Sequence, residues 1–309
     1  MPVFFLYFAA YMPLDAVLQL EAFYFLSVVM IEVPSGWLAD RLGRRPTLLA
    51  GAVLMAVSHL MLFIGPWVMA GDAFGSPLFV FFAVGQGLRA AGVAFRSGTD
   101  TALHHDALAA CGLSSEFADR EARASKRRFL GAAAAAVIGG GVAVIDLRLP
   151  YACSFIVAIA MIIVIARMRE PSASADARSR ANIFMQAVSC FAQWKSSALL
   201  LLFVFAAMML VLNHIPYEYF QPYIEEAIGQ DGLAAASTPI VTGLHVAVTF
   251  WIASLVSAKS IRIRNRIGLW GVLLLAMGLQ VLTIGLMSLW LSPIIVLFLL
   301  LRSCPRALM

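Results

Sequence analysis

Long apolar runs alternate with short polar connections along almost the whole chain. Eight runs have the length of a membrane-spanning helix, because about 20 apolar residues cross about 30 Å of hydrocarbon. They comprise residues 17–38, 46–68, 77–103, 129–145, 149–165, 198–212, 239–256 and 267–290. Two further runs, 2–12 and 292–301, are too short to cross a bilayer as written. The pattern predicts an all-α polytopic membrane protein.

Composition agrees with this prediction and argues against a soluble fold. Of the 309 residues, 62% are hydrophobic and only 13% are charged, and the mean hydropathy is +0.89. Soluble domains average about a quarter charged residues. The four cysteines, at positions 111, 153, 190 and 304, are too far apart for a disulfide framework or a zinc site. We therefore expect no metal and no cofactor.

The basic residues predict the orientation of the chain. Of the 22 Lys and Arg residues, 19 lie in every second connection, whereas the opposite connections hold only Arg148 and a span contains Arg89 and Arg96. This positive-inside pattern predicts that the basic connections, and the N-terminus of the full-length protein, are cytoplasmic. Because topology explains the net charge of +5, we expect the lipid bilayer as a partner and no nucleic acid.

One connection, 169–195, is longer than the others and divides the chain. Residues 171–180 are small and polar, and the apolar residues between 183 and 191 have the spacing of an amphipathic helix on the membrane surface. We predict an N-terminal six-helix bundle at 1–168 with a partial first helix and a cytoplasmic linker at 169–195. A partial C-terminal bundle at 196–309 would contain helices 7–10, with helix 10 truncated.

A motif follows the first complete run: Gly36-Trp-Leu-Ala-Asp40-Arg41-Leu-Gly43-Arg44-Arg45. It resembles the signature loop between helices 2 and 3 of the major facilitator superfamily (MFS), G-x-L-a-D-r-x-G-r-r/k. Gly43 permits a tight turn, and the arginines can contact the inner membrane surface. The resemblance implies a conformational-switch motif formed by these residues, with Asp40 facing helix 11. The alternative is a plain basic anchoring loop.

The resemblance also implies a fold and a function. The fold would be the MFS fold of two six-helix bundles, incomplete here, with half of helix 1, helices 2–9 and part of helix 10. Residues 97–108 resemble the S-G-x-x-x-A-L-x-x-D-x-L stretch of bacterial exporters. We therefore expect a monomeric secondary transporter of the bacterial inner membrane, moving a small organic solute by alternating access as a proton-coupled export antiporter. Facilitated metabolite uptake, or a non-transporting receptor on the same fold, are the alternatives.

The connection between the runs 239–256 and 267–290 is expected to carry a degenerate second copy of the motif. Residues 259–268 keep the basic charge and a glycine, but the acidic residue is lost. In the helix-5 run, the glycines at 139–141 only partly match the motif of many MFS antiporters, because no proline is present. We interpret these small residues as sites of close helix packing.

Charged residues inside spans are the main candidates for transport chemistry, because they are costly in a bilayer. On a continuous helix over 77–103, Arg89, Arg96 and Asp100 fall within about 40° of one another and would line a cavity. The alternative is a structural ion pair between Arg96 and Asp100. Glu32 lies at a similar depth to Arg96, so we predict that they pair, with Glu32 as a structural partner or a proton-coupling carboxylate.

Further polar groups are weaker candidates. Glu21 is expected near the outer mouth, and Asn213, His214 and Glu218 surround Pro216 at the end of a span, where they suit an extracellular gate or an interfacial aromatic belt. The adjacent His104 and His105 point about 100° apart on a helix, which is poor geometry for a metal. The sequence contains no G-x-S-x-G, H-E-x-x-H or P-loop motif, so no enzymatic activity is expected.

Overall fold

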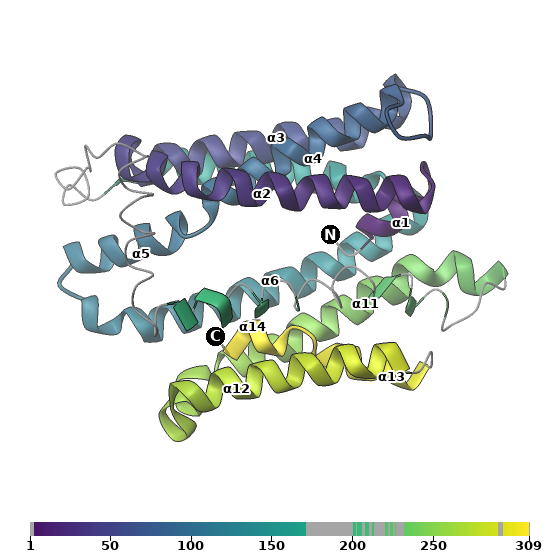
Figure 1. Ribbon diagram of the computed structural model, residues 1–309. Coiled ribbons are helices and arrows are strands. Elements are labelled where there is room, and N and C mark those ends of the chain that lie inside the picture. Colours follow the sequence, from purple (N-terminus) through teal and green to yellow (C-terminus); the bar gives the residue numbers. More distant parts are fainter. Residues whose placement is uncertain are drawn as a thin grey trace. The chain divides into compact units, whose positions relative to one another are not determined.

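The computed structural model describes residues 3–170, 232–289 and 293–308, and part of the segment 200–226 (Figure 1). Over these residues the chain is helical and no strand occurs. The main helices are α1 (Phe4–Ala9), α2 (Leu14–Leu42), α3 (Arg44–Val68), α4 (Pro77–Arg96), α5 (Thr99–Ala110), α6 (Phe117–Ile145), α7 (Leu149–Arg167), α11 (Gly232–Ser257), α12 (Ser260–Leu289), α13 (Pro293–Phe298) and α14 (Cys304–Leu308). Two 3₁₀ turns are η1 (Ser114–Glu116) and η3 (Leu299–Leu301).

Seven helical segments of the described part are long and apolar enough to cross a membrane. They are Leu14–Leu42, Arg44–Val68, Pro77–Ala110, Ser114–Ile145, Leu149–Arg167, Thr238–Ser257 and Ser260–Leu289. Six of them contain a whole run expected from the sequence, and Ser260–Leu289 covers the run 267–290 except for its last residue. The remaining run, 198–212, and the expected linker helix fall wholly or partly outside the described residues. The prediction of an all-α polytopic membrane protein is confirmed.

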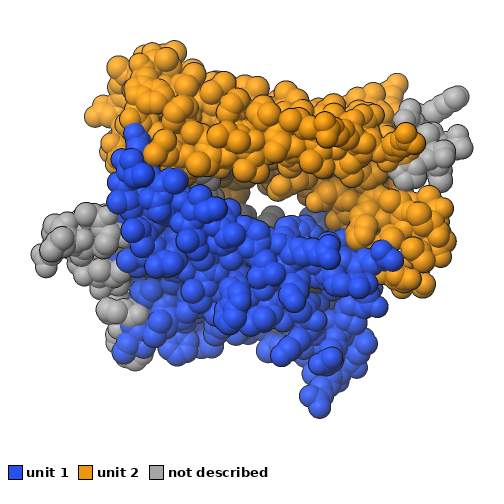
Figure 2. Space-filling view, turned by 180° about the vertical axis from the view of Figure 1, so that it is seen from behind, with its two compact units in different colours: residues 1–6, 118–147, 194–309 blue, residues 7–117, 148–193 orange. Residues whose placement is uncertain are grey.

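The chain divides into two compact units (Figure 2). Unit 1 comprises Met1–Leu6, Ala118–Leu147 and Trp194–Met309, and unit 2 comprises Tyr7–Phe117 and Arg148–Gln193. This division differs from the expected bundles at 1–168 and 196–309, because helix α6 falls in the same unit as α11 and α12. The bundle boundaries themselves stay a prediction.

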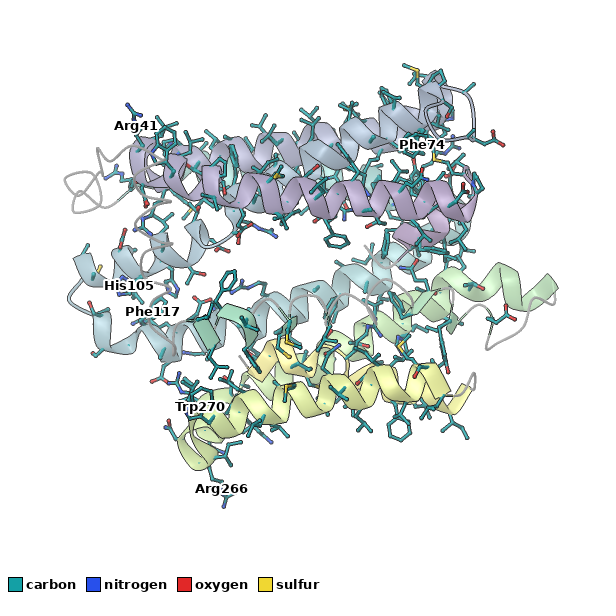
Figure 3. All side chains as sticks on the ribbon, in the orientation of Figure 1. Arg41, Phe74, His105, Phe117, Arg266 and Trp270 are labelled. Atoms are coloured by element: carbon teal, nitrogen blue, oxygen red, sulfur yellow. The ribbon has the colours of Figure 1, made fainter. Side chains whose placement is uncertain are left out.

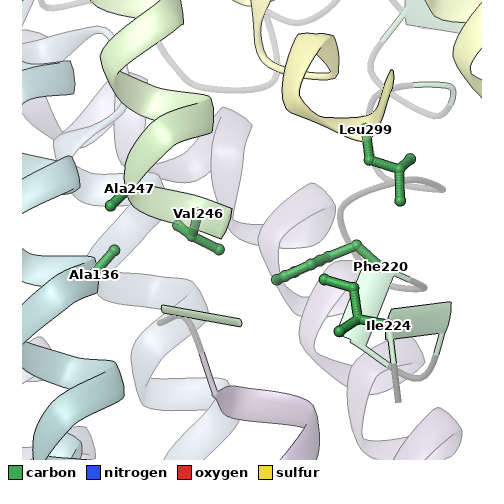
Figure 4. Packing of buried hydrophobic residues seen from close by; sticks show 6 residues of the cluster. All are labelled: Ala136, Phe220, Ile224, Val246, Ala247 and Leu299. Carbon is green, nitrogen blue, oxygen red and sulfur yellow. The ribbon is translucent and has the colours of Figure 1, made fainter. Parts of the chain in front are cut away.

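Two glycines explain why α6 is grouped with α11 in unit 1. A Cβ atom added to Gly140 would lie 2.7 Å from the carbonyl oxygen of Pro239, and one added to Gly243 would lie 2.8 Å from that of Ala136. The backbones therefore touch without intervening side chains, which is how small residues bring membrane helices together. Next to this contact lies a buried apolar cluster of unit 1 (Figure 4), formed by Ala136, Phe220, Ile224, Val246, Ala247 and Leu299.

The core of unit 2 is organised around α3, which packs against both α4 and α7. A Cβ atom at Gly92 of α4 would lie 2.8 Å from the carbonyl oxygen of Gly51 on α3. One bonded pair joins the same two helices, since the Ser58 hydroxyl donates to the Gly85 carbonyl at 2.7 Å. This close packing fixes the register of α4 on α3, and with it the position of the polar side chains on α4.

Glycines with positive φ separate the helices at two points in unit 2. Gly43, with φ 106° and ψ 158°, is the whole connection between α2 and α3, so the expected tight turn is confirmed. Gly98, with φ 69°, lies between α4 and α5 and breaks the continuous helix expected over 77–103. Residues other than glycine rarely adopt such φ values.

Candidate functional site

A group of buried polar side chains lies between α2 and α4 of unit 2. Glu21 of α2 is only 7% exposed, and Gln86 of α4 is fully buried. Gln86 Nε2 donates a hydrogen bond of 3.0 Å to Glu21 Oε1. Arg89, almost one turn further along α4, interacts electrostatically with Glu21 and places its guanidinium 4.2 Å from the centroid of the Tyr24 ring. A carboxylate and an arginine thus lie together inside membrane-spanning helices, where single charges are costly.

Three atoms of this region have unused hydrogen-bonding capacity. Glu21 Oε2, Gln86 Oε1 and Nδ1 of His59, a 7% exposed residue of α3, are buried without a hydrogen-bond partner among the described residues. The electrostatic influence of Arg89 reaches His59 as well as Glu21. Buried polar atoms are normally bonded, so all three atoms are able to bind a water molecule or a solute, and the Glu21 carboxylate and the His59 ring are also able to accept a proton.

Aromatic rings adjoin the polar group within unit 2. Tyr151 of α7 lies 6.5 Å from the His59 ring and 4.5 Å from the Tyr7 ring, measured between centroids. Tyr7 also contacts Phe8 and Phe82 at 5.1 and 5.6 Å, and its hydroxyl donates to the carbonyl of Leu62. A few polar groups beside aromatic walls are the usual composition of a small-molecule site.

Sequence reasoning found only part of this group. Arg89, a predicted cavity residue, belongs to it. Glu21 was expected near the outer mouth but is buried against Gln86, because α2 begins at Leu14 and places Glu21 two turns inside the helix. Gln86 and Tyr24 were not predicted. The one available signal was that Gln86 is an amide in an otherwise apolar stretch of α4.

The predicted pair between Glu32 and Arg96 is wrong. In the part of the chain that the structure describes, no ion pair joins them, and the hydroxyl of Ser97 donates to Glu32 Oε1 at 2.6 Å. Glu32 itself is exposed on α2. Glu32 does lie at the level of Arg96 along the helices, since its partner Ser97 is adjacent to Arg96. However, α4 ends at Arg96, and the hydroxyl of the next residue makes the hydrogen bond to Glu32.

The predicted stripe of Arg89, Arg96 and Asp100 is also interrupted. It assumed one continuous helix, but Gly98 turns the chain before α5 begins at Thr99. Asp100 is therefore in the first turn of a separate helix, where its Oδ1 atom accepts a hydrogen bond of 2.8 Å from the Thr101 amide. Of these three residues, Arg89 is the one that adjoins the buried polar group.

Arg44, in the signature motif, contacts two acidic residues of unit 2. Its Nε atom lies 2.9 Å from Asp106 Oδ2 on α5, and both side chains are partly buried. Its backbone amide donates to Glu170 Oε1, just after α7, at 2.8 Å. Arg44 therefore links the start of α3 to α5 and to the segment after α7.

The other arginines of the motif also have partners. Arg45 donates to the carbonyls of Ile165 and Ala166 at the end of α7, at 3.3 and 2.6 Å, where a cation is favourable for the helix dipole. Arg41 lies 5.1 Å from the centroid of the Trp37 ring. Gly36 and Asp40 are exposed on α2. The motif is thus an intramolecular junction more than a plain anchoring loop.

Unit 1 contains a buried arginine of its own. Arg302 is 5% exposed, lies 4.1 Å from the centroid of the Phe220 ring, and places Nη1 3.0 Å from His245 Nδ1 and 3.3 Å from the Thr249 hydroxyl. Because arginine only donates hydrogen bonds, His245 Nδ1 must accept. His245 Nε2 then carries the proton and donates to the Val296 carbonyl at 2.8 Å.

Several predicted residues lie elsewhere. Asn213, His214 and Glu218, the candidate gate residues, fall outside the described residues. His104 and His105 pack against the Phe117 ring, with centroids 5.7 and 5.1 Å away (Figure 3). Across the described ranges, no three His, Cys, Asp or Glu residues form a group able to hold a metal ion.

Comparison with solved structures identifies the fold. No family model and no curated protein matches the chain. The crystal structure of a D-xylose–proton symporter matches with a TM-score of 0.63 and 14% identity, over 95% of this chain and 70% of that one. The xylose transporter XylE from E. coli, in a partially occluded inward-open conformation, matches with a TM-score of 0.60 and 12% identity, over 95% and 74% of the two chains.

This chain has the major facilitator fold. The agreement extends over nearly all of its length. The expected fold class is therefore confirmed. At these identities the likeness concerns the fold alone.

Proposed function

We propose that this multi-pass membrane protein is a secondary transporter that moves a small polar solute by alternating access and couples this movement to protons at Glu21. One observation carries the proposal. Glu21 Oε2, Gln86 Oε1 and His59 Nδ1 are buried in membrane-spanning helices, without hydrogen-bond partners among the described residues. Ionisable groups in such positions typically belong to a substrate or proton pathway.

The contacts of Glu21 suit a carboxylate that gains and loses a proton. When it is ionised, the Gln86 amide and the Arg89 guanidinium stabilise its charge. When it is protonated, the electrostatic attraction to Arg89 is lost, and the positive charge of Arg89 then acts more strongly on a solute nearby. Protonation and solute binding are thereby linked through Arg89, and a coupling free energy between two ligands is reciprocal.

The direction of transport is proposed from the solved neighbours. One is a D-xylose–proton symporter, in which solute and proton move together. This favours proton-driven uptake over the export antiport expected from residues 97–108. D-xylose is therefore the first probe, and ethidium tests the export alternative.

The motif of Gly36, Asp40, Arg41, Gly43, Arg44 and Arg45 supplies the second part of the proposed mechanism. Arg44 and Arg45 link α3 to α5, to the end of α7 and to Glu170. These contacts join helix ends on the predicted cytoplasmic side, so making or breaking them would accompany the change between inward-open and outward-open states.

Transport in proteoliposomes tests the proposal. The purified full chain is reconstituted with the pH dye pyranine inside, and external D-xylose is added without a pH gradient. Symport predicts that D-xylose entry brings protons and acidifies the lumen. Glu21→Gln should reduce this proton movement at least about tenfold while labelled solute exchange persists, because the variant keeps a neutral polar group beside Gln86.

The matched control is Asp15→Asn, which removes an exposed carboxylate from the same helix and should leave both readouts unchanged. Proton movement that survives Glu21→Gln would exclude Glu21 as the coupling group. If the wild-type chain moves neither D-xylose nor ethidium, the transport proposal is contradicted.

A further inference from the structure

In unit 1, Lys259 between α11 and α12 and three arginines in the first turns of α12, Arg262, Arg264 and Arg266, form a group of four cations, here called the basic tip. All four residues are exposed. Within the described ranges, none of their side chains takes part in an ion pair or a hydrogen bond. Four like charges within eight residues repel one another, so this arrangement favours a counter-charge from outside the chain.

The sequence around the basic tip offers no such counter-charge. Residues 232–309 contain six Lys and Arg residues and no Asp or Glu. The linker 169–195 contains two acidic residues, Glu170 and Asp176, against Arg169, Arg178, Arg180 and Lys195, so it is itself basic, and Glu170 already accepts a hydrogen bond from the Arg44 amide. The four acidic residues of 200–231, Glu218, Glu225, Glu226 and Asp231, precede α11, whereas the basic tip follows the other end of that helix, so none of these segments supplies the counter-charge at the basic tip.

Large apolar side chains adjoin the basic tip at the same end of α12. Ile267, Leu269 and Trp270 are 45%, 53% and 57% exposed, and Figure 3 shows Arg266 and Trp270 at this end. Beyond them the helix continues as an apolar span. Cations followed by an exposed tryptophan and then by apolar residues are the arrangement that membrane helices have at the headgroup level.

We propose that the basic tip binds the headgroups of anionic phospholipids of the phosphatidylglycerol type. Arginine and lysine side chains donate charge-assisted hydrogen bonds to phosphate oxygens. Each basic residue close to an anionic membrane surface strengthens binding about fivefold. Trp270, Leu269 and Ile267 hold the basic tip at the depth of the lipid headgroups, because they lie between the cations and the apolar span. This lipid site does not depend on the proposed transport function.

An acidic protein segment is the other class of partner that four cations would attract. The structure favours lipid, because the exposed apolar residues beside the basic tip continue without interruption into a membrane-spanning helix. Arg44 and Arg45 provide the internal contrast. Their hydrogen-bonding groups are engaged by Asp106, Glu170 and carbonyls of α7, and they therefore compete less well for a headgroup.

Trp270 is a built-in reporter for this proposal. The other five tryptophans of the full chain are replaced by Phe, and the protein is placed in lipid nanodiscs of phosphatidylcholine with 20 mol% phosphatidylglycerol. Bromine on a lipid chain quenches tryptophan on contact. Brominated phosphatidylglycerol should quench Trp270 at least about threefold more than the same fraction of brominated phosphatidylcholine in 50 mM KCl. The ratio should fall toward one in 500 mM KCl, because salt screens exposed charges.

Replacing all four cations of the basic tip with Gln should bring the quenching ratio close to one. The matched control replaces four exposed arginines elsewhere with Gln, namely Arg123, Arg127, Arg128 and Arg169, and should keep the wild-type ratio. An equal loss in this control would overturn the proposal, because total charge would then explain the enrichment. A wild-type ratio of one would also overturn it, and binding of a polyglutamate peptide in its place would assign the basic tip to a protein partner.

Native mass spectrometry of the unmodified chain keeps the test independent of the tryptophan substitutions. Phosphatidylglycerol should remain bound to the wild-type protein at collision energies that strip phosphatidylcholine. The Arg→Lys variant at positions 262, 264 and 266 should retain most of this excess, because its charge is unchanged. Equal retention of the two lipids by the wild-type chain would contradict the proposal.

Discussion

Two basic junctions of this chain have a similar backbone conformation at a glycine but differ in the contacts of their arginines. Gly43, between α2 and α3, has φ 106° and ψ 158°, and Gly268, inside α12, has φ 74° and ψ 172°. Three residues before each glycine stand Asp40 and Asn265, and an arginine follows each of them. In unit 2 the arginines around the glycine contact acidic groups and carbonyls of the same unit, whereas in unit 1 they are exposed and unpaired within the described residues.

The difference shows that a repeated turn can be kept while its electrostatic role changes. The positive φ requires glycine at both places whatever the neighbouring side chains do. The contacts that the arginines make depend on residues distant in the sequence, since Asp106 and Glu170 supply the carboxylates in unit 2. Residues 232–309 contain no equivalent acid. Loss of the acidic partners turns an internal junction into an outward-facing surface.

The largest expected effect tests the shared backbone. Gly43→Val and Gly268→Val should each destabilise the protein by about 1–3 kcal/mol, because a β-branched residue is strained at these φ values. Gly43→Val should cost more, since it also displaces Arg44 from Asp106. Thermal unfolding followed by fluorescence-detected size exclusion measures both variants. A Gly43→Val protein as stable as wild type would show that the turn tolerates other backbone conformations.

An intermediate effect tests the partnered arginine. Asp106→Asn removes the charge 2.9 Å from Arg44 and should lower the free energy of unfolding by about 1 kcal/mol, because the pair is partly screened by solvent. Arg264→Gln, which removes an unpaired exposed charge, should change stability by less than about 0.5 kcal/mol. Urea titration of the two variants checks the contrast. Equal losses would mean that the junctions do not differ energetically.

The smallest expected effect restores the missing acid. Asn265→Asp places a carboxylate where the first junction has Asp40, and it partly neutralises Arg264 and Arg266. The preference of Trp270 for brominated phosphatidylglycerol should fall about twofold, less than in the variant without the four cations. Asn265→Gln is the control and should leave the quenching ratio as it is in wild type. A preference that rises with the aspartate would contradict an electrostatic basis.

The sequence was sufficient for the spans and for the turn at Gly43, because both depend on local patterns of about 20 residues or fewer. It failed at Gly98, since a glycine inside an apolar run gives no sign of whether its φ is positive. The burial of Glu21 was not foreseen, because it depends on contact with Gln86, 65 residues away. Likewise, Glu32 was assigned the right depth but the wrong partner, because hydrogen bonding across helices is decided at the level of one residue.

The contact between Gly140 and Gly243 has a mechanical consequence. Where two helices meet through side chains, those side chains pack into grooves of the facing helix. Moving one helix along the other then requires each side chain to leave its groove. Here bare backbone faces bare backbone, with a hypothetical Cβ only 2.7–2.8 Å from the opposite carbonyl oxygens. At this point no side chains of α6 and α11 interlock, so a short shift of one helix along the other would not require a side chain to change its rotamer here.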